Sequence, residues 1–142
     1  PGSRMHTEGD LAPTTAAAAR DAFAALEAPA RTVTREVARA VLEPETFDDR
    51  LTDDVERRAQ EALFASRLAV HVGDRAAFDD WLAAQENEYE VVELGSDNVS
   101  GVAWHAAPFA ETVIAATFSA EPDAAVETLR RQAVGRLYDE VV

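Results

Sequence analysis

Residues 99–118 read VSGVAWHAAPFAETVIAATF, and this stretch decides the fold. Two strand patterns, 99–106 and 112–118, flank a Pro-Phe pair, so the stretch predicts a β-hairpin with its turn at Ala107–Ala110. The second strand is apolar on both of its faces, whereas a sheet with one solvated face would alternate polar and apolar residues. Either the helices of this chain or a second subunit must therefore cover both sides of the sheet.

Two further strand patterns lie outside the hairpin, RLAVHVG at 67–73 and EYEVVEL at 88–94. The residues before position 67 have helical periodicity. Asp74 is placed to cap a short helix between the two strands, and Pro122 opens a final helix. We therefore predict an α+β fold, in which N-terminal helices precede a mostly antiparallel four-stranded sheet. The order of the sheet-containing part is β-α-β-β-β-α, and helices back the sheet.

The first residues, 1–4, precede a methionine and are interpreted as a remnant of expression. We expect residues 5–142 to form a single α+β domain, with a helical half at about 13–65 and a sheet-containing half at about 67–142. No apolar run approaches the roughly 20 residues of a membrane span. The sequence therefore predicts a soluble, cytoplasmic protein that does not enter a membrane.

The charge balance is the most informative property of the composition. The chain has 27 acidic residues against 13 basic ones, a net charge of −14, and all the basic residues are arginine. At molar salt the Debye length falls to about 3 Å, which screens the self-repulsion of such a chain. We interpret the composition as an adaptation to a salt-saturated cytoplasm. Since there is no cysteine, a disulfide framework and a cysteine-ligated metal are excluded.

Trp104 and His105 are the most noticeable side chains of the predicted hairpin. A turn at 107–110 would place Trp104 opposite Val113 and His105 opposite Thr112. Because side chains alternate along a strand, Trp104 and His105 point to opposite faces, and we expect Trp104 in the core. His105 and His71 both lie among small residues. If their strands are neighbours, the two imidazoles would approach one another on one face.

Two interpretations of this histidine pair remain open. With a carboxylate, His71 and His105 would bind a divalent metal or provide a general base. Neither an HxH nor an HxxxH spacing is present, and no carboxylate stands at a fixed distance. The favoured interpretation is that each histidine is packed in the interior or at an interface. We therefore predict no catalytic residue, no metal and no cofactor, and keep His71 and His105 as candidate binding residues.

Three arginines, Arg31, Arg35 and Arg39, repeat every four residues and share one face of a predicted helix. This arginine stripe would contact an anion or an acidic partner, or it is a solvated face. The other side of the helix carries the valines expected to face inward: Val33, Val37 and Val41. Nucleic acid is a disfavoured partner, because the next helix would present Asp53 and Asp54 to the phosphates.

Four segments resemble a haloarchaeal family of short proteins classed as a domain of unknown function. They read MHTEGDLAP, REVARAV, ALFASRLAVHVG and VAWHAAPFAETVIAATF followed by LRRQAVGRLYDEVV. The similarity runs over essentially the whole chain from Met5. It implies a haloarchaeal source, in agreement with the charge balance. It implies no activity, cofactor or catalytic residue.

Three functions remain in order of preference. The first is a non-catalytic protein–protein interaction module, which forms a homodimer if a second subunit covers the sheet. The second is a nucleic-acid-associated or regulatory domain that uses the arginine stripe. The third is a small-molecule or metal site near His71 and His105.

Overall fold

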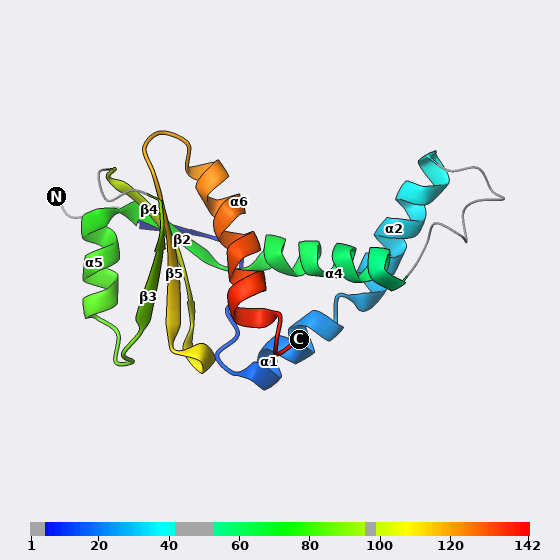
Figure 1. Ribbon diagram of the computed structural model, residues 1–142, viewed down its shortest axis with the longest axis horizontal. Coiled ribbons are helices and arrows are strands. Elements are labelled where there is room, and N and C mark those ends of the chain that lie inside the picture. The colour runs from blue at the N-terminus through cyan, green and yellow to red at the C-terminus, as the bar shows by residue number, and fades with distance from the viewer. Residues whose placement is uncertain (1–4, 42–52, 96–98) are drawn as a thin grey trace.

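The computed structural model describes residues 5–41, 53–95 and 99–142. Helix α5 lies on one face of a five-stranded sheet and helix α6 on the other, while α2 and α4 project sideways from this body (Figure 1). The fold is α+β, as predicted. Its elements are β1 (Met5–Glu8), α1 (Ala16–Ala24), α2 (Glu27–Val41), α4 (Asp53–Arg67), β2 (Val70–Asp74), α5 (Arg75–Ala83), β3 (Glu90–Leu94), β4 (Gly101–Ala107), β5 (Thr112–Phe118) and α6 (Pro122–Ala133).

The sheet has one strand more than the sequence predicts. Strand β1 pairs antiparallel with β2, with Met5 opposite Gly73 and Glu8 opposite Val70. The guanidinium of Arg130 on α6 donates a hydrogen bond to the Glu8 carbonyl oxygen at 3.2 Å and so ties β1 to the helix layer. The remnant predicted for residues 1–4 lies outside the described residues.

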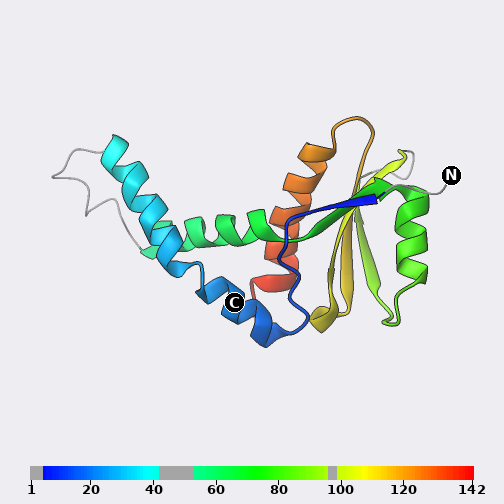
Figure 2. The same ribbon diagram turned by 180° about the vertical axis from the view of Figure 1, so that it is seen from behind.

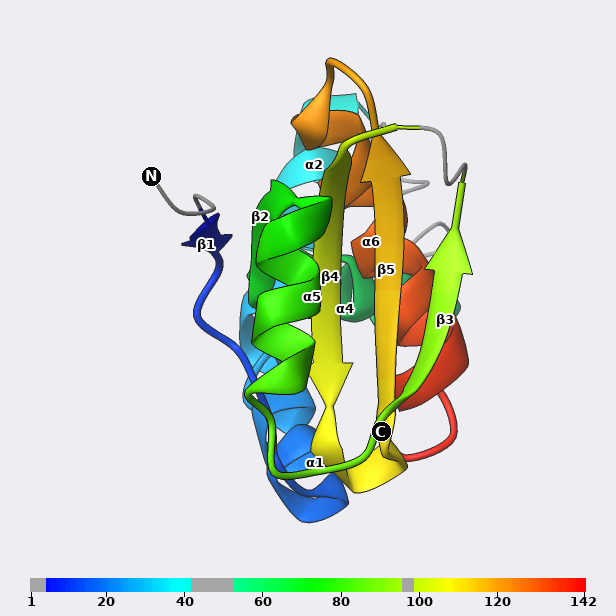
Figure 3. The same cartoon turned by 90° about the vertical axis from the view of Figure 1, so that its left-hand side faces the viewer.

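The strand order is β1-β2-β4-β5-β3, and this corrects the expected connection of the strands. An antiparallel meander would place β3 beside β4. Instead β3 pairs in parallel with β5, with Val92 opposite Ile114, and β4 pairs antiparallel with β2. Figure 3 shows α5 lying over β2 and β4, with β3 at the far edge beside β5. The sheet is therefore mixed, because helix α5 carries the chain from β2 to the opposite edge.

The hairpin of β4 and β5 is present, but its register differs from the prediction by two residues. Trp104 pairs with Ala115 and His105 with Ile114. The turn is shifted because Pro108–Ala110 forms a 3₁₀ turn and Glu111 adopts a left-handed conformation, with φ of 52°. Glu111 therefore belongs to the turn and not to the strand.

Each face of the sheet has its own apolar core. The core on the α6 side includes side chains of α1, α4 and α6, and the core on the α5 side is centred on Phe78 and Trp104. The four consecutive apolar residues of β5, from Val113 to Ala116, are all buried. The helices of this chain thus cover both faces, which was one of the two alternatives for the doubly apolar strand.

Two predicted helix starts are confirmed. The Asp74 carboxylate accepts a hydrogen bond from the Ala77 backbone N–H at 2.7 Å, and Pro122 occupies the first turn of α6. Helix α6 continues into a π-helical turn, Val134–Tyr138, which places Tyr138 in the core. No helix in the described part of the chain is both long and apolar enough to cross a bilayer.

Candidate functional site

The two candidate histidines lie on opposite faces of the sheet, so the predicted approach of His71 and His105 is wrong. Strands β2 and β4 are neighbours, but their register places His71 opposite Trp104 and not opposite His105. His71 therefore shares the α5 face with Trp104, and His105 points to the α6 face. Within residues 5–41, 53–95 and 99–142, no three His, Asp or Glu side chains converge as metal ligands.

His105 forms a closed hydrogen-bonded pair with Tyr138. The imidazole is 1% exposed, its Nδ1 lies 2.7 Å from the Ala69 carbonyl oxygen and its Nε2 lies 2.6 Å from the Tyr138 hydroxyl. A carbonyl oxygen only accepts, so Nδ1–H donates to it and Nε2 accepts from the hydroxyl. Burial lowers the pKa of His105 from 6.5 to about 4. His105 is thus neutral and packed against the C-terminal helical layer.

His71 belongs to an aromatic cluster beneath α5. Its ring centroid lies 5.7 Å from that of Trp81 and 5.5 Å from that of Trp104, and its Nδ1 lies 2.8 Å from the Thr7 hydroxyl on β1. The ring is half-buried, and burial lowers its pKa. Trp104 is fully buried, which confirms its predicted place in the core. Among the described residues, no hydrogen-bond partner faces its indole N–H.

The arginine stripe lies on α2, which together with α4 forms a projecting arm (Figure 2). Arg31 contacts Glu27 one turn earlier at 3.2 Å and Glu56 on α4 at 3.6 Å. Arg31 therefore links the two helices of the arm. Arg35 and Arg39 are exposed.

The valines of α2 do not face inward as predicted. Val33 is 44% exposed and Val37 is 58% exposed, whereas Ala30 is 1% exposed. The buried side of α2 is thus marked by Ala30, and Thr34, one turn later on that side, is half-buried. The side chain of Val41 lies outside the described part of the chain.

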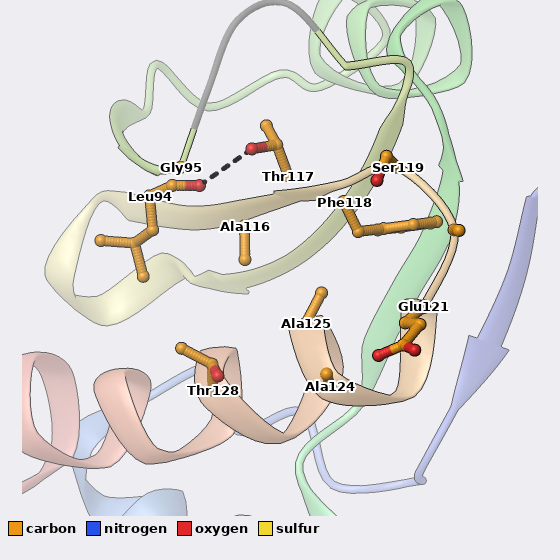
Figure 4. Close-up of a pocket in the computed structure, with 11 residues that line it drawn as sticks. Leu94, Gly95, Ala116, Thr117, Phe118, Ser119, Glu121, Ala124, Ala125 and Thr128 are labelled. Atoms are coloured by element: carbon orange, nitrogen blue, oxygen red, sulfur yellow. Dashed lines mark hydrogen bonds between the residues drawn. The ribbon is translucent and has the colours of Figure 1, made fainter.

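A groove of about 510 Å³, which the sequence analysis missed, lies between the sheet and the first half of α6 (Figure 4). It opens at the carboxyl ends of the parallel strands β3 and β5, where ligands of α/β sheets commonly bind. The space exists because small residues face one another across it, and no sequence motif signals such an arrangement. Its lining residues include Leu94, Ala116, Thr117, Phe118, Glu121, Ala124 and Thr128.

The sequence model of a family described as a family of unknown function (DUF5809) matches residues 10–139. The matched span begins after β1 and includes the arm, strands β2 to β5 and α6. No match was found among curated proteins or among solved structures.

Proposed function

The chain belongs to this family of unknown function, DUF5809, and on that premise we propose a function from its geometry and its charge. The protein is a non-catalytic protein–protein interaction module that forms a homodimer through α2. The observation that carries the proposal is the exposure of Val33 and Val37 on a helix that projects from the sheet body (Figure 1).

The two valines suit a second copy of the same helix. Val33 and Val37 are one helical turn apart and lie on the same side of α2. In a twofold dimer each surface meets itself, so an antiparallel pair of α2 helices would bring Val33 of each copy against Val37 of the other. This contact would remove four exposed branched side chains from water.

The charge distribution also favours α2 as the meeting point. The whole chain carries a net charge of −14, so two copies repel one another over most of their surface. Helix α2 carries three arginines and two glutamates and is net positive. In a twofold contact this helix meets its own copy, and a net charge of one unit on each α2 keeps the local repulsion small.

We place this dimer in a salt-saturated, haloarchaeal cytoplasm. The support is the composition, in which 27 acidic residues stand against 13 arginines with no lysine, and the family resemblance of the sequence. At molar salt the repulsion between copies is screened beyond about 3 Å. Burial of the valines then decides whether the copies associate.

Light scattering in molar KCl tests the proposal. The native protein should have the mass of a dimer, and Val33→Ser/Val37→Ser should have the mass of a monomer with an unchanged circular dichroism spectrum. Met5→Ser is the matched control, because Met5 is 46% exposed on β1, far from the arm. A monomeric native protein would overturn the proposal, and a dimer that only Met5→Ser dissociates would assign the contact to the sheet edge.

The exposed Arg35 and Arg39 make nucleic acid the alternative partner to be tested. We expect no mobility shift of DNA or RNA with the native protein, because its net charge repels phosphates. A shift that is lost when Arg31, Arg35 and Arg39 are replaced by glutamine would support the alternative function in place of the homodimer.

A further inference from the structure

The groove beside α6 has the dimensions and the chemistry of a small-molecule site. Its volume of about 510 Å³ falls in the usual range for ligand pockets. Ala116 and Phe118 of β5 form one wall, and Ala124 and Thr128 of α6 form the other (Figure 4). The groove lies on the sheet body, away from the arm, so it is independent of the proposed dimer.

Two glycines allow side chains of β5 to pack closely at the end of the strand. Gly95 has a φ of 103°, and a Cβ there would collide with the Thr117 hydroxyl, which donates a hydrogen bond to the Leu94 carbonyl at 3.3 Å. A Cβ on Gly101 would collide with the ring of Phe118. Gly101 thus permits the close approach that places the Phe118 ring in the wall, whereas Gly95 permits the Thr117 side chain to pack on the opposite face of β5, beside the end of β3.

The polar groups of the groove favour a cation. Glu121 is the charged side chain among the described lining residues, and Ser119 and Thr128 contribute hydroxyl groups. Asp123 follows Glu121 in the first turn of α6 and adds a second negative charge at this end of the helix. Two carboxylates outweigh the half positive charge of a helix N-terminus.

We propose that this groove binds a small primary amine with a compact apolar body. The ammonium group pairs with the Glu121 carboxylate, and the apolar body packs against Ala116, Phe118 and Ala124. The apolar contacts supply most of the affinity, because an exposed ion pair contributes little.

Nuclear magnetic resonance titration in molar KCl tests this site with three probes of one length: n-butylammonium, n-butanol and butyrate. We expect n-butylammonium to shift the amide signals of Thr117, Ser119, Ala124 and Thr128 at the lowest concentration. The uncharged n-butanol should need about two- to fivefold more, and butyrate, which the Glu121 carboxylate repels, should need more than n-butanol. Glu121→Gln should weaken n-butylammonium binding by about two- to fivefold, the range expected for an exposed ion pair. Ala124→Leu should abolish it by filling the groove.

The controls are matched in kind to the two variants. Glu88→Gln removes an exposed carboxylate elsewhere, and Ala76→Leu enlarges an exposed alanine of α5. Both should bind n-butylammonium as the native protein does. Equal responses to all three probes, no response to any of them, or shifts unaffected by Ala124→Leu would overturn the proposal. Because Ala124 and Glu121 are exposed, neither variant threatens the core.

Discussion

The Tyr138 hydroxyl donates a hydrogen bond to Nε2 of His105 at 2.6 Å, and both side chains are almost completely buried. The opposite ring nitrogen donates to the Ala69 carbonyl at 2.7 Å. Both nitrogens of the imidazole are therefore satisfied inside the protein. The contact joins β4 to the π-helical turn after α6 and aligns the helix layer with the sheet.

Tyr138→Phe should destabilise the protein by about 1–3 kcal/mol, because it leaves Nε2 of His105 buried without a donor. Urea unfolding in molar KCl measures the change. Tyr89→Phe is the matched control, since the Tyr89 hydroxyl accepts one long, exposed hydrogen bond from the Asn87 amide at 3.4 Å. This variant should change the stability by less than about 0.5 kcal/mol. Equal losses in the two variants would contradict the assigned role of Tyr138.

The stability should fall as the pH drops from about 6.5 to 4. Burial holds the pKa of His105 at about 4 in the folded state, whereas its ordinary value is 6.5. The unfolded chain therefore takes up a proton first, and the free energy of unfolding decreases by about 3 kcal/mol across this window. Burial lowers the pKa of His71 as well, which acts in the same direction.

The histidine contribution is measured directly from the ring signals of His105 during a pH titration of the folded protein. A titration midpoint near 4 is expected. This readout separates His105 from the 27 acidic residues, whose mutual repulsion also changes with pH. A midpoint near 6.5 would show that the ring is not desolvated.

Withdrawal of salt should unfold the protein. The Debye length grows from about 3 Å at molar salt to about 30 Å at 0.01 M, so the repulsion within a chain of net charge −14 is no longer screened. Far-ultraviolet circular dichroism during dialysis from molar to low-millimolar KCl measures the loss of structure. A spectrum that stays constant throughout would contradict the proposed adaptation to salt.

Two glycine substitutions should act in opposite directions. Gly135→Ala should stabilise the protein by about 0.5–1 kcal/mol, because the residue lies in a helical turn and a Cβ there would contact nothing within 4 Å. Gly101→Ala should destabilise it by about 1–3 kcal/mol, because the new methyl group displaces the Phe118 ring. Urea unfolding of both variants, compared with the native protein, measures the difference in sign.

Local patterns predicted those elements whose signals lie within a few residues. Strand β5 is found at the predicted residues, 112–118, and the capping role of Asp74 is confirmed. Strand β1 was missed because MHTE is short and largely exposed, so it shows no apolar alternation. The partner of β3 was missed because a strand pattern does not specify which strand it pairs with.

The errors at the candidate sites have related causes. The relative position of His71 and His105 depends on the register between β2 and β4, which are some thirty residues apart in the chain. The orientation of α2 depends on the fit of Ala30 against its neighbours and not on the hydrophobicity of Val33 and Val37. The groove beside α6 exists because small side chains of β5 and α6 face one another. No pattern within either element alone predicts this arrangement.

Strand β1 covers the edge of β2 that would otherwise be the edge of the sheet. It is four residues long, and it lies along β2, whose sequence VHVGD is more apolar. If β1 were released, the backbone N–H and C=O groups of β2 would be open to pairing with another chain. Removal of residues 1–8 should therefore promote aggregation, because the exposed β2 strands of different molecules could then pair.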